Sequence, residues 1–221
     1  MISFADIYTE ACLRHGEQEA QRRLPRPATA GELEDMDEAR YLSLMSRRIF
    51  RAGLRHSMVD ARWPAFEEAF HGFDVDRVRM LSDDDLDAML RDARLIRHWR
   101  KLQAVRHNAA VLYDLRASHG GFGRYLAAWP VTDCVGLWRD LKKRFAQLGG
   151  NSGPYFLRMA GKDTFILTGD VIRALNRWGA YEGDPRTLKA KEAVQDAFNM
   201  WREESGRPQC QISRILALSI D

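Results

Sequence analysis

The chain has 221 residues, a length that fits one domain of moderate size or two joined lobes. Hydrophobic residues make up 45% of it and charged residues 29%, a balance that excludes intrinsic disorder and predicts a folded core. The formal net charge is only +3, so the total charge alone does not indicate a nucleic-acid partner.

Apolar residues at helical spacing predict helices through the first half of the chain. Ser3 can cap the first helix, and the proline-containing stretch 19–31 predicts a connector. Ser82 can cap another helix, because the acidic residues that follow it suit the positive end of a helix dipole. The later helices of this half are predicted over 35–51, 63–70 and 83–93.

The second half of the chain is also predicted to be helical, with a glycine-rich loop at 119–123. Helices are expected over 97–115, 122–128, 133–147, 153–160, 169–178 and 185–204. No stretch alternates between apolar and polar residues as a strand does. The expected fold class is therefore all-α.

A tight turn with few side chains precedes the helix predicted at 153–160. Glycine permits positive φ and a close approach of another backbone, and Pro154 suits the first turn of a helix. Exposed amides at such a helix start can bind a phosphate, although a well-capped corner between two helices would look the same. The candidate DNA-binding residues of this turn are Gly149, Gly150, Ser152, Gly153 and Tyr155.

This turn and the segments after it resemble the helix–hairpin–helix glycosylases of base-excision repair. The matching residues are Leu148–Gly149–Gly150, Gly153–Pro154–Tyr155, Lys162–Asp163–Thr164–Phe165 and Thr168–Gly169–Asp170–Val171–Ile172. Further upstream the chain is similar to DNA-3-methyladenine glycosylase I. The residues most specific to that similarity are Ile96–Arg97–His98, Lys101–Leu102–Gln103–Ala104 and Asn108–Ala109. Together the two similarities cover about 36–178.

The resemblance implies an all-α fold of two helical lobes, with 1–221 forming a single glycosylase domain. The helix–hairpin–helix motif would lie at about 137–161. Residues 1–30 and 179–221 would share one lobe, and 36–150 would build much of the other. The protein would act as a monomer on double-stranded DNA that carries a damaged base, without membrane association.

The implied activity is that of a monofunctional DNA glycosylase that releases alkylated purines of the 3-methyladenine type. Such an enzyme flips a nucleotide into a pocket, and a buried carboxylate can stabilise the positive charge that grows on the sugar. Asp170 is the catalytic candidate, but it could instead cap the helix that follows, and the register could place this position on Thr168. The type I family itself lacks this aspartate. Because no lysine lies between Lys143 and Lys162, a strand-cleaving Schiff base is not expected.

The implied base pocket departs from the family at two positions. Ungapped alignment through Ala52–Gly53–Leu54 places Arg48 where the family has a glutamate that reads adenine, and His56 where it has a tryptophan. A guanidinium cannot accept a hydrogen bond from an exocyclic amine, so this pocket does not favour 3-methyladenine. A glycosylase for a different lesion, a non-catalytic DNA-binding relative and a protein-interaction module are the alternatives. The aromatic residues that could stack on a base, or equally pack in the core, are Trp63, Trp99 and Tyr155.

Basic residues gather in two segments, 47–62 and 91–107. Arg94, Arg97 and Lys101 are three and four residues apart, as on one face of a helix. Phosphate binding by Arg97 and Lys101 is the functional interpretation, and a solvated face with acidic partners is the alternative.

Three cysteines lie far apart without a CxxC pair, at Cys12, Cys134 and Cys210. Their spacing does not support a cysteine zinc site or an iron–sulfur cluster, and their odd number indicates reduced thiols in a cytoplasm-like compartment. The type I family binds zinc near both termini, but no histidine follows His119, so neither zinc nor another cofactor is expected. No apolar run approaches the roughly 18 residues that span a bilayer, and the N-terminal segment is unlike a signal peptide.

Overall fold

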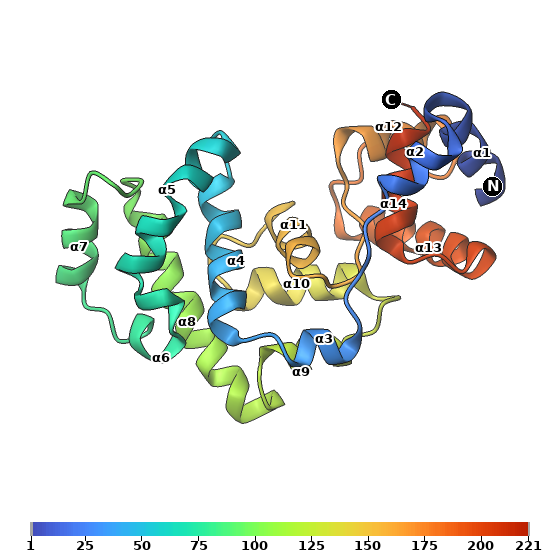
Figure 1. The fold of residues 1–221 in the computed structure, drawn as a ribbon. Coiled ribbons are helices and arrows are strands. Elements are labelled where there is room, and N and C mark those ends of the chain that lie inside the picture. Colours follow the sequence, from blue (N-terminus) through green and yellow to red (C-terminus); the bar gives the residue numbers. More distant parts are fainter. Residues whose placement is uncertain (1, 221) are drawn as a thin grey trace. The chain divides into compact units, whose positions relative to one another are not determined.

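The computed structural model describes residues 2–220, which form helices and no strand, so the predicted all-α fold class is confirmed (Figure 1). The helices of the first half are α1 (Phe4–His15), α2 (Glu17–Arg22), α3 (Ala30–Glu34), α4 (Glu38–Arg51), α5 (His56–Ala69), η1 (His71–Phe73), α6 (Val75–Val78) and α7 (Asp83–Arg91). Those of the second half are α8 (Trp99–His119), α9 (Phe122–Ala128), α10 (Cys134–Arg144), α11 (Ser152–Met159), α12 (Gly169–Arg177), α13 (Leu188–Ser205) and α14 (Gln209–Leu218).

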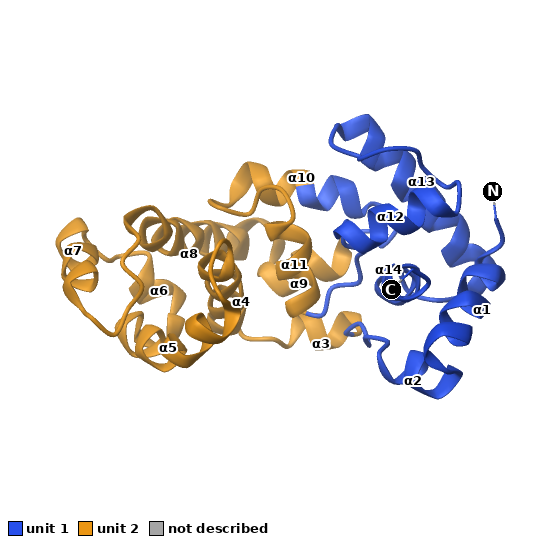
Figure 2. Cartoon of the chain, turned by 90° about the horizontal axis from the view of Figure 1, so that it is seen from above, with its two compact units in different colours: residues 1–28, 130–138, 161–221 blue, residues 29–129, 139–160 orange. Residues whose placement is uncertain are grey.

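The helices fall into two compact units, each built from separate stretches of the chain (Figure 2). Unit 1 comprises residues 1–28, 130–138 and 161–221, and unit 2 comprises 29–129 and 139–160. Helix α10 begins in unit 1 and ends in unit 2 without a break.

Unit 1 is built around α14, which contacts α1, α12 and α13. Aromatic rings fill the neighbouring core: Phe165 stacks on Phe198 with ring centroids 4.2 Å apart, and Trp138 meets Phe165 edge-on at 4.6 Å. Asp163 caps α14, because its carboxylate accepts hydrogen bonds from the backbone N–H groups of Gln209 (3.0 Å) and Cys210 (2.8 Å).

Helix α14 was not predicted from the sequence, which placed the last helix at 185–204. It is buried on nearly every side, including Ile212, Ile215 and Leu218. Because its apolar residues do not form a single stripe, the helical period is hidden. The cap that starts the helix comes from Asp163, which is remote in sequence.

Unit 2 is organised by α8, whose long buried face contacts α4, α6, α7 and α9. Stacked rings form its aromatic core: Trp63 lies 5.2 Å from Phe66 and 5.4 Å from Phe73 between centroids, and Phe70 lies 5.5 Å from Phe73. Helix α4 buries most of its length against this core and α8. Its last turn carries residues of the site described below.

Several predicted boundaries require correction. Helix α5 begins at His56 and contains Pro64, although Trp63–Pro64 was predicted to open the helix. Proline removes one helical hydrogen bond, but burial of Val59, Trp63 and Phe66 along the same helix offsets that loss. Helix α2 extends to Arg22 and so occupies the first part of the predicted connector 19–31. The capping predictions are confirmed, since Ser3 and Ser82 accept hydrogen bonds from the N–H groups of Ala5 and Asp85.

Candidate functional site

The turn between α10 and α11 is held in place by α8. Asn108 is fully buried, and its side chain spans the turn: its Nδ2 donates to the carbonyl of Ala146 (3.2 Å), and the Ala146 N–H donates to its Oδ1 (2.8 Å). His107 adds a contact of 3.0 Å between its Nε2 and the carbonyl oxygen of Arg144. The sequence placed Asn108 only within a matching motif, and the structure assigns it this positioning role.

The predicted DNA-binding residues of the turn differ in accessibility. Gly150 is exposed and has a φ of 58°, whereas Gly149 is half-buried. Ser152 is the first residue of α11 and half-buried. Gly153 is buried, and a Cβ there would lie 3.0 Å from the carbonyl oxygen of Leu148, so its role is to allow close packing of the turn. Phosphate binding at this turn stays a prediction.

Helix α11 packs against α4, and this contact brings Tyr155 to Arg48. The Arg48 guanidinium carbon lies 4.4 Å from the centre of the Tyr155 ring, a cation–π arrangement. The Nε of Arg48 is buried, and among residues 2–220 it has no hydrogen-bond partner. Burial, with a smaller contribution from the nearby Arg51 charge, lowers the pKa of the Arg48 guanidinium. The two Nη groups of Arg48 also lack a partner within residues 2–220 but are not closed off from solvent, so they are the donors that a ligand in the pocket could satisfy.

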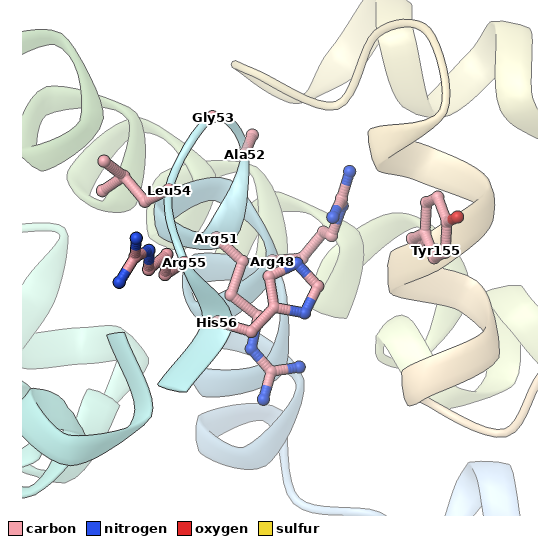
Figure 3. Close-up of a pocket in the computed structure, with 8 residues that line it drawn as sticks. All are labelled: Arg48, Arg51, Ala52, Gly53, Leu54, Arg55, His56 and Tyr155. Atoms are coloured by element: carbon pink, nitrogen blue, oxygen red, sulfur yellow. The ribbon is translucent and has the colours of Figure 1, made fainter. Parts of the chain in front are cut away.

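These two residues line an open pocket of about 550 Å³ in unit 2 (Figure 3). Its lining residues are Arg48, Arg51, Ala52, Gly53, Leu54, Arg55, His56 and Tyr155. The pocket therefore carries three arginines and no carboxylate, which makes it strongly electropositive. The sequence-based prediction that Arg48 and His56 share a pocket is consistent with this geometry, and Tyr155 belongs to the same pocket.

Only part of this positive charge is available to a ligand. Arg51 donates to Asp60 at 2.6 Å, and Arg47 donates to the same carboxylate at 2.9 Å. The hydrogen bonds from Arg51, assisted by those from Arg47, lower the pKa of Asp60 and keep it ionised. In the described chain Arg48 and Arg55 have no such partner. Figure 3 shows the Arg48 side chain reaching toward Tyr155 and the Arg55 guanidinium directed away from it.

The two tryptophans predicted for the base pocket do not line it. Trp63 is 4% exposed, its Nε1 donates to Ser43 Oγ at 3.1 Å, and its ring stacks within the aromatic core. It is a core residue because its polar atom is satisfied inside the protein. Trp99 is half-buried at the first position of α8. The aromatic ring in this pocket is that of Tyr155, and the Arg48 guanidinium lies over one side of it.

Lys101 was predicted to bind phosphate, and the structure corrects this. Its side chain is buried, and its Nζ donates to the carbonyl oxygens of Ala52 (2.7 Å) and Phe50 (3.3 Å). Lys101 thus satisfies the free carbonyls at the C-terminus of α4. Arg97 is exposed, but it precedes α8 rather than sharing a helical face with Lys101. Its phosphate contact stays a prediction.

The proposed catalytic positions lie in unit 1 at the start of α12. Thr168 is the N-cap, and its hydroxyl accepts from the N–H of Val171 at 3.2 Å, so the alternative that Asp170 caps the helix is wrong. The carboxylate of Asp170 pairs with Arg173 one turn later and is 41% exposed. The expectation of a buried carboxylate is therefore not met. A catalytic role for Asp170 or Thr168 stays a prediction.

No three His, Cys, Asp or Glu side chains within residues 2–220 are grouped to hold a metal ion. Cys134 and Cys210 are buried, and burial raises the pKa of the Cys134 thiol to about 11. None of the helices described is both long enough and apolar enough to cross a bilayer.

Comparison with known proteins finds a family whose model covers most of the pocket. The model of the methyladenine glycosylase family matches residues 31–146, which include Arg48–His56 but not Tyr155, Thr168 or Asp170. A DNA-3-methyladenine glycosylase of Haemophilus influenzae is 37% identical over 76 residues, covering 34% of this chain and 41% of that protein. The chain thus spans about two fifths of the length of this curated relative.

Solved structures show the same fold at lower identity. A mutant of 3-methyladenine DNA glycosylase I in complex with 3-methyladenine aligns with a TM-score of 0.53 and 20% identity, covering 66% of this chain and 85% of that one. A mutant of the Staphylococcus aureus enzyme gives the same values. The resemblance predicted from the sequence is confirmed, and because the family match extends over more than half of its length, the chain belongs to the methyladenine glycosylase family.

Proposed function

We propose that this protein is a monofunctional DNA glycosylase that releases alkylated purines from double-stranded DNA in base-excision repair. The observation that carries the proposal is the pocket at the C-terminal end of α4, which offers hydrogen-bonding groups and an aromatic ring. A flipped base needs both, since it is held by stacking and by contacts to its edge. All of the pocket's lining residues except Tyr155 lie inside the family match. The relatives named above act on 3-methyladenine or take their name from it. As a repair enzyme the protein would work as a monomer in the cytoplasm, in a single glycosylase domain made of both units.

Excision requires stabilisation of the positive charge that develops on the sugar as the glycosidic bond breaks. We assign this role to Asp170, whose carboxylate stands in the first turn of α12, with Thr168 fixing the start of that helix. Asp170 pairs with Arg173 one turn later, and a carboxylate at this position could stabilise a cation or orient a water.

The proposed enzyme releases the base without cutting the strand. A strand-cleaving glycosylase attacks the sugar with a lysine amine, and α11 carries no lysine. The next lysine, Lys162, is 4% exposed, and its burial lowers the pKa of the amine without giving it access to a substrate.

DNA contacts are proposed at the α10–α11 turn and at Arg97. Gly150 is exposed, so a phosphate could approach the backbone of the turn there; at the start of α11 the Ser152 N–H already donates to the carbonyl of Gly149 and Pro154 has no N–H. Arg97 adds an exposed cation that belongs to the same unit.

Base release from methylated duplex DNA tests the proposal. Wild-type protein should liberate free methylated purines and leave the strand intact, with no adduct trapped by borohydride. Asp170→Asn should slow release by about a hundredfold or more, whereas Asp184→Asn should not change it. Asp184 forms a comparable short-range pair with Arg186 in the same unit and so controls for surface charge. If Asp170→Asn releases base at the wild-type rate, the protein is still a glycosylase but Asp170 takes no part in catalysis.

A second candidate function is recognition of DNA without catalysis. It is favoured by the exposure of Asp170 and by Arg48, which would repel a positively charged alkylated base. This function predicts salt-dependent duplex binding and no released base at any enzyme concentration. The same assay, run beside a gel-shift titration on the same DNA, separates the two functions.

A further inference from the structure

The most unusual feature of the pocket is that its one buried, unsatisfied polar atom belongs to an arginine. Within residues 2–220, Arg48 forms no hydrogen bond or ion pair, and its contact with Tyr155 is a cation–π contact that uses none of its N–H groups. A guanidinium has five N–H donors and no acceptor. Any group that completes this site must therefore bring acceptors.

The other cations of the pocket do not compete for this role. Arg51 is committed to Asp60, and the guanidinium of Arg55 points away from Tyr155 (Figure 3). Burial, and to a smaller extent the nearby charge of Arg48, lowers the pKa of Lys101. Both hydrogen bonds of the Lys101 amine go to backbone carbonyls at the end of α4. Arg48 is thus the group best placed to read the edge of a base that contacts Tyr155.

We propose that Arg48 makes this pocket select guanine-type purines, which present acceptor atoms to it, against adenine-type purines, which present an amino group. Guanine carries the acceptors O6 and N7 along one edge, and arginine pairs with both. Adenine offers N7 beside an amino group, so one N–H of the arginine would face another donor. This inference rests on the proposed glycosylase function and names the substrate class of that same site.

Among methylated purines the comparison is direct for 3-methylguanine and 3-methyladenine. The methyl group sits on the same ring atom in both, and both nucleosides carry the positive charge of alkylation. Repulsion by Arg48 is common to the two lesions and cancels in their ratio. The two bases differ at position 6, where 3-methylguanine carries the acceptor O6 and 3-methyladenine carries an amino group. A matched bidentate pair discriminates against the wrong base by about ten- to hundredfold.

The test uses the full-length protein and methylated calf DNA, from which released 3-methylguanine and 3-methyladenine are separated by chromatography. Wild-type protein should release 3-methylguanine faster, once each rate is divided by the amount of that lesion in the DNA. Arg48→Glu, which replaces donors by acceptors, should lower the ratio of the two rates at least tenfold. Arg48→Lys keeps the charge but loses the fork of parallel donors, so it should lower the ratio as well.

Arg77→Glu is the matched control for charge, because Arg77 is exposed on α6 in the same unit and lies outside the pocket. It should leave the ratio unchanged. Thermal melts of all variants show whether each is folded. Faster release of 3-methyladenine by folded wild-type protein, or a ratio that Arg48→Glu does not move, would overturn the inference while the glycosylase function stands.

Failure of the proposed function gives a different result, in which no methylated base is released by any variant. In that case calorimetric titration of wild-type protein with free 3-methylguanine and free 3-methyladenine decides the inference by itself. Tighter binding of 3-methylguanine, lost in Arg48→Glu, supports selection by Arg48. Equal binding, or no binding of either base, overturns it.

Discussion

Two basic residues that look equivalent in the sequence, Arg97 and Lys101, have different surroundings. Lys101 is 7% exposed and donates to two backbone carbonyls, whereas Arg97 stands exposed before α8. A buried charged donor contributes to stability through the groups it satisfies, and an exposed cation near DNA contributes to binding through released counterions. The spacing of basic residues cannot separate these roles, because it does not report which side chain is buried.

This difference leads to opposite outcomes for two substitutions. Lys101→Met should lower the free energy of unfolding by about 1–3 kcal/mol, because the carbonyls of Phe50 and Ala52 lose their donor. Arg97→Ala should leave stability nearly unchanged and reduce the slope of log affinity against log salt by about one. Urea unfolding and salt titrations of duplex binding measure the two effects. A weaker salt dependence in Lys101→Met at unchanged stability would restore Lys101 as a phosphate ligand.

At the scale of elements, the sequence predicted which helices exist more reliably than where each helix begins and ends. Caps such as Ser82 and the run of acids after it could be read directly, because a capping box is a local pattern. The start of α5 and the whole of α14 could not be predicted from local sequence. Helix α5 tolerates Pro64 because its other residues are buried, and α14 is capped by Asp163 from a distant segment. For the candidate site, the alignment brought Arg48 and His56 together, but the buried state of Trp63 depends on the tertiary core.

The α10–α11 turn owes its shape to Asn108, a residue of another helix. Asn108→Ala removes both the donor and the acceptor that satisfy Ala146, so unfolding should become easier by about 2–3 kcal/mol. Gln103→Ala on the same helix is the control, because within residues 2–220 the Gln103 side chain forms no hydrogen bond, and it should change stability by less than about 0.5 kcal/mol. Denaturant titration gives both values. Duplex affinity should fall in Asn108→Ala only if the turn contacts DNA, so an unchanged affinity in a folded variant would contradict that contact.

At the scale of the whole molecule, the interleaving of the two units predicts how they unfold. Unit 1 is assembled from three segments, and residues 29–129 of unit 2 separate the first from the second. If unit 2 unfolded alone, unit 1 would have to close a loop of about a hundred disordered residues, which costs conformational entropy. Helix α10 also runs unbroken from one unit to the other. We therefore expect the chain to unfold in a single cooperative transition.

The six tryptophans report on this directly, because Trp138, Trp178 and Trp201 lie in unit 1 and the others, Trp63, Trp99 and Trp129, in unit 2. In protein labelled with 5-fluorotryptophan, all native ¹⁹F signals should disappear at one urea concentration. Asp163→Ala removes the cap of α14 in unit 1, which costs about 1–2 kcal/mol, and should lower the midpoint of all the signals together. If Asp163→Ala lowers the urea midpoint of only the three unit 1 signals, the two units unfold independently and the expectation of a single transition is wrong.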